Sequence, residues 1–189
     1  QLSKTRLGVQ WEPPHERGSA LLLWQLARHD TEIVCEFPRN ALSTEFKDLK
    51  PGKRYSYSVR VSNQVGWSEW SEKSTPTPTL TGLPERPSRP VMTSAGITAI
   101  ELTTLKPDNN GKIISKFIVK RRVLRAGGQK TEWGNEVNCT ATPGVTGTVC
   151  ELRLEQLTPN TVFQFLVAAV NAHGTSEWSL PSIRCRTLP

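Results

Sequence analysis

The sequence predicts an all-β fold built from two copies of one module, and three observations support this prediction. Apolar and polar residues alternate in short runs, as from Tyr55 to Ser62, which is the period of a strand with one buried face. Proline (14) and glycine (13) separate these runs, and no long segment has helical periodicity. Finally, the stretch at 49–71 recurs at 157–179.

The repeat becomes clear when LKPGKRYSYSVRVSNQVGWSEWS is aligned with LTPNTVFQFLVAAVNAHGTSEWS. The matched residues are 108 positions apart, as 171 is from 63. They are Leu49 with Leu157, Pro51 with Pro159, Tyr55 with Phe163, Asn63 with Asn171, Gly66 with Gly174, and Trp70 with Trp178. An offset held at separated positions indicates two modules, which we expect to span 1–83 and 84–189.

This block resembles the second half of a fibronectin type III domain, in which a Leu-x-Pro turn precedes an alternating strand and a Gly-x-Ser hairpin. The resemblance covers nearly the whole chain. It implies two immunoglobulin-like β-sandwiches in tandem, each made of two antiparallel sheets packed face to face. It also implies a corner in which the hydroxyl of Tyr55 ties its strand to the preceding turn. Because Phe163 has no hydroxyl, we expect the second corner to rest on packing alone.

The other strands of the first module follow from the same resemblance. Trp11-Glu12-Pro13 matches the family's core tryptophan in its second strand. Only six residues precede Leu7, so we expect the family's first strand to be incomplete. The expected strands are 7–14, 18–28, 31–37, 41–49, 55–62 and 72–79. The last should lie at an edge, because its prolines cannot donate to a ladder.

The second module begins with a junction at 81–90, TGLPERPSRP, whose prolines predict a stiff, extended segment. Asp108-Asn109-Asn110-Gly111 is a strong turn signal. Phe117 and Val119 follow Gly111 with the spacing that Trp24 and Leu26 have from Gly18. The expected strands are 97–107, 117–121, 131–140, 149–157, 163–170 and 180–189.

The net charge of +7 is concentrated in the second module, which has 13 basic and 8 acidic residues. The excess lies in one stretch without acidic residues: Lys112, Lys116, Lys120, Arg121, Arg122, Arg125 and Lys130. Such a patch suits an anionic surface or a glycan. The alternative is a solvated strand edge, where lysines deter mispairing. Nucleic acid is the least favoured partner, because no stacking aromatics are interleaved with the basic residues.

Trp67-Ser68-Glu69-Trp70-Ser71 resembles the WSxWS sequence of class I cytokine receptors. That resemblance implies that Trp67 and Trp70 stack with an arginine of the neighbouring strand, for which Arg60 is the candidate. Two interpretations remain open: membership of that receptor class, or a structural ladder that stiffens an edge.

Cys139 and Cys150 flank a short loop and predict a disulfide that contributes ~2–3 kcal/mol. Asn138-Cys139-Thr140 is a glycosylation sequon, so both features favour an extracellular protein. The first module has Leu42 where the partner of Cys35 would stand. The alternative is therefore a cytoplasmic or cytoskeletal protein with reduced, buried thiols. No Cys-x-x-Cys or histidine spacing suggests a metal site.

The sequence contains no recognisable catalytic constellation and suggests no cofactor. No apolar run approaches the ~20 residues of a membrane span. We therefore expect a non-catalytic protein-binding and spacer segment of a larger multidomain scaffold or adhesion protein, with another protein as its partner. The alternatives are an ectodomain fragment of a cytokine-type receptor and accessory modules of a larger enzyme.

Overall fold

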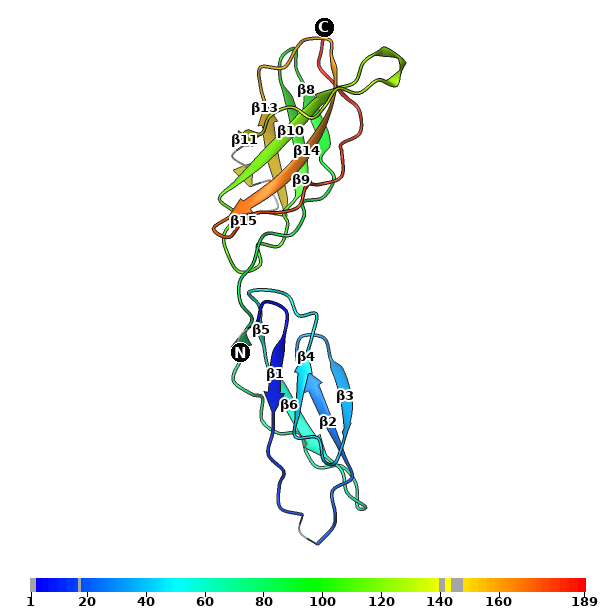
Figure 1. Ribbon diagram of the computed structural model, residues 1–189, viewed down its shortest axis with the longest axis vertical. Coiled ribbons are helices and arrows are strands. Elements are labelled where there is room, and N and C mark those ends of the chain that lie inside the picture. Colours follow the sequence, from blue (N-terminus) through cyan, green and yellow to red (C-terminus); the bar gives the residue numbers. More distant parts are fainter. Residues whose placement is uncertain (1–2, 17, 140–141, 144–147) are drawn as a thin grey trace. The chain divides into compact units, whose positions relative to one another are not determined.

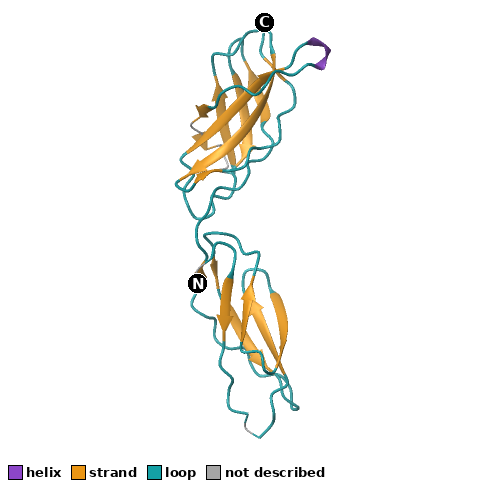
Figure 2. Ribbon diagram, in the orientation of Figure 1, coloured by secondary structure: helices purple, strands orange, loops and turns teal. Residues whose placement is uncertain are grey.

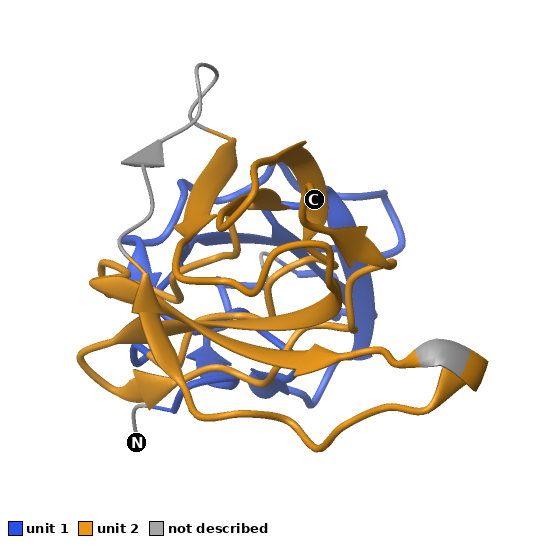
Figure 3. Cartoon of the chain, turned by 90° about the horizontal axis from the view of Figure 1, so that it is seen from above, with its two compact units in different colours: residues 1–81 blue, residues 82–189 orange. Residues whose placement is uncertain are grey.

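The computed structural model describes residues 3–16, 18–139, 142–143 and 148–189. The chain forms two compact units, Gln1–Thr81 and Gly82–Pro189, which are blue and orange in Figure 3. The expected boundary lay two residues later. Among the described residues the helical part is a single turn, Ala126–Gly128, purple in Figure 2. The fold is therefore all-β, as the sequence predicts.

Unit 1 has short antiparallel strands in three groups (Figure 1): a β3-β2-β6 sheet, a β1-β4 pair and a β5-β7 pair. The strands are β1 Leu7–Gln10, β2 Leu23–Arg28, β3 Ile33–Pro38, β4 Ser43–Phe46, β5 Arg54–Tyr55, β6 Tyr57–Val61 and β7 Thr77–Pro78. Among the described residues of this unit β1 comes first, and nothing corresponds to the strand that opens unit 2.

The core of unit 1 confirms the alternation predicted around β6. Tyr55, Tyr57 and Val61 are buried in one cluster. Trp24 on β2 is only 2% exposed, and the ring of Trp11 lies 6.0 Å from it. Large aromatic side chains thus fill the space between the sheets, which is how a sandwich of fewer than 100 residues buries enough apolar area to fold.

Unit 2 has two larger sheets. One has the order β12-β13-β9-β8, and the other β11-β10-β14, with β15 and β16 also pairing with β14. The strands are β8 Val91–Ala95, β9 Ile100–Leu105, β10 Lys116–Val123, β11 Val137–Cys139, β12 Thr142–Pro143, β13 Val149–Leu154, β14 Val162–Asn171, β15 Gly174–Thr175 and β16 Cys185–Arg186. The inward side chains of both sheets, such as Leu102 and Phe165, form one buried core.

The prediction of a final strand at 72–79 is wrong for most of that range, because β7 covers only Thr77–Pro78. Instead, Ser68, Ser71 and Ser74 run beside β6. The N–H of each serine donates to a β6 carbonyl at 2.8–2.9 Å. Each hydroxyl accepts the N–H of the same β6 residue at 3.0–3.1 Å. We call this arrangement the serine zipper. Its period of three is that of polyproline II, not of a strand.

Unit 2 has the same serine zipper, formed by Ser176, Ser179 and Ser182 along β14. The N–H to carbonyl distances are 2.8–2.9 Å, and each hydroxyl accepts an N–H at 3.0 Å. Here the three serines are buried. The Ser-x-x-Ser-x-x-Ser pattern that ends both modules is therefore a backbone-pairing device, which satisfies strand groups that would otherwise lack partners.

The junction expected as a stiff spacer is, from Gly82 onward, part of unit 2. The N–H of Gly82 donates to the carbonyl of Asn110 at 3.0 Å, and that of Glu85 to Asp108 at 2.8 Å. The amide of Asn171 donates to the carbonyl of Gly82 at 2.8 Å. The side chains of Pro87 and Pro90 are fully buried. The prolines thus pack against this module, and their role is not that of a free linker.

Candidate functional site

The outer face of unit 1 carries a stack of one arginine and two tryptophans. The guanidinium carbon of Arg60, on β6, lies 5.0 Å from the ring centroid of Trp67 and 4.5 Å from that of Trp70. Each tryptophan directly precedes a serine of the serine zipper, Ser68 or Ser71. Because the zipper repeats every three residues, both indoles emerge on the same side and meet the same cation.

A row of polar side chains across three strands holds Arg60 in place. Arg60 on β6 is paired with Gln25 on β2, which is paired with Glu36 on β3. The Nε of Arg60 donates to Gln25 Oε1 at 2.8 Å, and Gln25 Nε2 donates to Glu36 Oε1 at 2.7 Å. These bonds fix the plane of the guanidinium over the rings, so the sheet, the zipper and the stack form one continuous layer.

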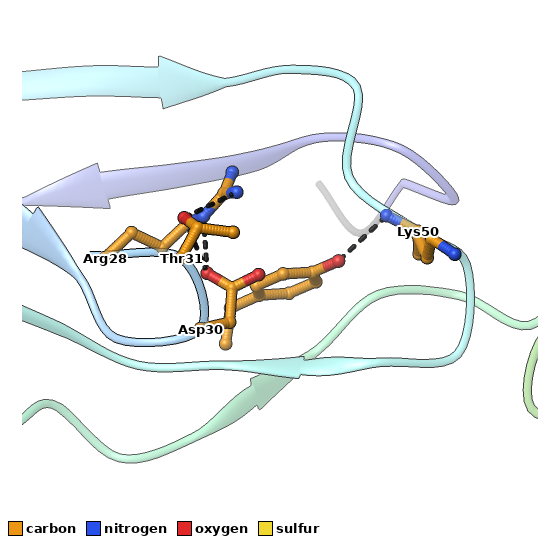
Figure 4. Close-up of polar contacts among 5 residues, drawn as sticks. Arg28, Asp30, Thr31 and Lys50 are labelled. Atoms are coloured by element: carbon orange, nitrogen blue, oxygen red, sulfur yellow. Dashed lines mark hydrogen bonds and ion pairs between the residues drawn. The ribbon is translucent and has the colours of Figure 1, made fainter. Parts of the chain in front are cut away.

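The structure places the hydroxyl of Tyr55 in the corner that the resemblance implies. The N–H of Lys50 donates to the Tyr55 hydroxyl at 2.8 Å, the dashed line that reaches Lys50 in Figure 4. Figure 4 also shows Arg28 bonded to Asp30 at 2.6 Å and to Thr31 at 3.0 Å. The guanidinium of Arg28 lies 5.7 Å from the Tyr55 ring, so the corner is enclosed by a cation as well.

The second corner does not rest on packing alone. Phe163 stacks on Phe165 with centroids 5.9 Å apart. In addition, the Thr187 hydroxyl donates to the carbonyl of Thr158 at 2.7 Å and accepts the N–H of Thr161 at 3.0 Å. Thr79 makes the equivalent bonds in unit 1. A threonine clip therefore supports both corners, and unit 2 lacks only the tyrosine bond.

The seven basic residues predicted as one patch do not form one surface. Lys116 Nζ donates to Asn138 Oδ1 at 2.9 Å. Lys120 pairs with Glu136 at 3.3 Å and lies 4.5 Å from the Trp178 centroid. These two and Arg122 alternate along β10 on the outer face of the sheet. Arg121 has the opposite parity, Lys112 precedes the strand, and Arg125 and Lys130 lie in the loop after it.

Sequence reasoning missed two further stacks in unit 2. The guanidinium of Arg122 lies 4.3 Å from the Trp133 centroid and bonds Gln164 Oε1 at 2.7 Å. The stack of Lys120 on Trp178 is the counterpart of the one on Trp70. The aligned position of Arg60 is Ala168, so the cation comes from β10 rather than from β14. The alternation of basic residues along 116–122 was the sequence signal that could have predicted these stacks, because it places the cations on one face of the strand.

The predicted disulfide is not formed: the structure has all four cysteines as free thiols. Cys139 lies in the β11-β10-β14 sheet and Cys150 in the β12-β13-β9-β8 sheet. Both pack in the core as small apolar groups, and burial raises the pKa of each thiol. Asn138 is exposed on β11, whereas Thr140 of the predicted sequon lies outside the described residues.

Among the described residues, no group of three His, Cys, Asp or Glu side chains is arranged to hold a metal ion. Over the same residues, no helix is long and apolar enough to cross a membrane.

The chain is similar to segments of much longer proteins. It is 25% identical over 179 residues to fibronectin type-III domain-containing protein 3a of Gallus gallus, covering 90% of this chain and 13% of that protein. It is 23% identical to protein sidekick-2 of Mus musculus, covering 100% of this chain and 9% of the relative. Fasciclin-2 of Schistocerca americana is 28% identical, with 69% and 16% covered.

A crystal structure of the chicken CNTN1 FN1–FN3 domains has the same fold. The TM-score is 0.72 at 18% identity, covering 99% of this chain and 64% of that one. The fibronectin type III domain family matches residues 1–77 and 85–184, one match for each unit. The chain therefore belongs to the fibronectin type III family, with two domains in tandem.

Proposed function

We propose that the chain is a non-catalytic, extracellular protein-binding segment of a multidomain adhesion protein. Relatives such as sidekick-2 and fasciclin-2 are cell-surface adhesion proteins that contain this domain. The polar side chains described above bond to one another or to the backbone and hold the sheets together. We therefore expect a partner to bind the exposed loops and the exposed apolar surface instead.

The observation that carries this proposal is an exposed apolar surface at one end of unit 1. Val65, in the hairpin after β6, is 90% exposed, and Trp67 is 40% exposed. They line an open hollow of about 650 Å³ together with Leu21 and residues 14–16. Leu22, beside it, is 45% exposed. An apolar surface of this kind, rimmed by polar residues, is typical of a protein-binding site.

Beads coated with the chain test the proposal on live cells. Val65→Asp places a charge in the hollow at a position whose side chain makes no core contact, so it should abolish bead retention without lowering the melting temperature. The matched control is Ile113→Asp, because Ile113 is 84% exposed on unit 2. Equal retention of the wild-type and Val65→Asp beads, or equal loss with Ile113→Asp, would contradict the proposal.

A cytokine-type receptor ectodomain is the second candidate, and the stack of Arg60 on Trp67 and Trp70 favours it. A receptor segment predicts saturable binding of a soluble secreted protein to the immobilised chain. An adhesion segment predicts retention on cell surfaces that survives washing and is unaffected by conditioned medium. The bead assay, run with and without conditioned medium, separates the two.

A further inference from the structure

A second surface, in unit 2, has the features of a site for an anion. The loop after β10 projects from the sandwich (Figure 1) and encloses a hollow of about 410 Å³. The residues that line it include the basic Arg125, Lys130 and Arg184 and the apolar Leu124 and Val162. Arg184 lay outside the basic stretch singled out in the sequence, because it is far from Arg125 along the chain.

Hydrogen bonds bring these three segments together. The N–H of Leu124 donates to the carbonyl of Val162 at 2.8 Å, which fastens the start of the loop to β14. Leu124 and Lys130 form an antiparallel bridge, which closes the loop. Arg184 directly precedes β16, whose Arg186 is paired with Val162. Gly127 and Gly128 have φ values of 77° and 80°, so the loop makes a tight turn that favours glycine at both positions.

The charges around this hollow are not balanced. Among the described residues that line it, none is Asp or Glu. Over the part of the chain that the structure describes, the side chains of Arg125, Lys130 and Arg184 make no hydrogen bond or ion pair. Lys120 and Arg122, close by in sequence, are both engaged. Like charges that converge without partners create a positive potential that attracts an anion.

We propose that this hollow binds a sulfate group of a sulfated polysaccharide. Two guanidinium groups and an ammonium suit a tetrahedral oxyanion, because arginine donates in a bidentate manner. The apolar lining residues suit the faces of a sugar ring, and none of the described residues around the hollow is an aromatic that could stack on a nucleic-acid base. An acidic peptide strand could not add to β14 here, because β14 is already paired with β10 and β16. This site would bind a polysaccharide, which is a different class of ligand from the protein partner proposed above. The two proposals share only the extracellular location of the chain.

The test is the dissociation constant of a heparin octasaccharide for the full chain, measured by titration calorimetry in about 150 mM NaCl, where diffuse charge is largely screened. Lys130→Glu and Arg184→Glu are the site variants. Lys112→Glu is the control, because it changes the charge equally and lies beyond the other end of β10, roughly 26 Å away at ~3.3 Å per residue. Melting temperatures verify that each exposed substitution leaves the fold intact.

We expect each site variant to weaken binding about ten-fold or more, the usual effect of losing a charge-assisted contact. Lys112→Glu should change it by less than about two-fold, and the desulfated octasaccharide should not bind. The inference is overturned if Lys112→Glu weakens binding as much as the site variants, since the attraction is then diffuse. It is also overturned if wild type fails to bind, or if polyglutamate or phosphatidylserine vesicles bind as tightly with the same sensitivity. None of these results bears on Val65 or the bead assay.

Discussion

Replacing Arg60 by alanine should remove the centre of the outer layer of unit 1. Its guanidinium lies 5.0 Å from the Trp67 centroid and 4.5 Å from that of Trp70, and Nε donates to Gln25 at 2.8 Å. Each partly exposed stack contributes about 0.5–1 kcal/mol, and the hydrogen bond about as much. Because these contacts share one network and are not additive, we expect a loss of about 1–2 kcal/mol. That loss lowers the melting temperature by roughly 4–15 °C for a domain of this size.

Urea and thermal unfolding, followed by tryptophan fluorescence and circular dichroism, measure this loss. Arg39→Ala is the matched control, because Arg39 is an exposed arginine of the same unit whose side chain makes no hydrogen bond, ion pair or ring contact among the described residues. Trp70→Ala alone should also cost about 1–2 kcal/mol. In the double-mutant cycle with Arg60→Ala we expect a coupling of about 0.5–1 kcal/mol. A coupling of zero, or Arg60→Ala behaving like Arg39→Ala, would refute the reasoning.

Three further predictions concern single side chains. Ser179→Ala removes a buried hydroxyl that accepts the N–H of Val167 at 3.0 Å; we expect a loss of about 1–3 kcal/mol in urea unfolding, and a loss under about 0.5 kcal/mol would contradict the role of the zipper. Burial raises the pKa of Tyr57 to about 12, so the folded state holds this proton more tightly than the unfolded one. Stability should therefore fall by about 2–3 kcal/mol as the pH rises from about 10 to 12, and Tyr57→Phe should remove this part of the fall. All four cysteines should alkylate in denaturant without reductant, and only the partly exposed Cys35 quickly in the native state; a mass lacking two alkyl groups would show a disulfide.

The strands and the two modules follow from the sequence because side-chain alternation and a constant offset are local signals. Tyr55 is recognisable as a core residue from the alternation around it, and Trp24 from the resemblance of its strand to the family pattern. The serine zipper is not recognisable in this way. The segment from Ser68 to Ser74 is so short that a spacing of three residues cannot be told apart from the alternation of a short strand. Pro76 and Pro78 indicate that the strand's hydrogen-bond ladder is interrupted, but they do not indicate which arrangement replaces it.

The contacts between distant segments could not be derived from the sequence. Trp178 aligns with Trp70, yet its cation is Lys120, because the aligned position holds Ala168 and the register places a different strand beside the ring. Arg184 lines the same hollow as Arg125 because β16, which Arg184 directly precedes, pairs with β14. The structure has Cys139 and Cys150 as free thiols, which the length of the loop between them does not reveal.

The most direct test of the central claim uses an antibody against these two domains on cells that express the natural protein. If the chain is part of an extracellular adhesion protein, intact cells should stain as strongly as permeabilised cells, and protease added outside should remove the signal. Staining that requires permeabilisation, with a signal that resists external protease, would contradict the account.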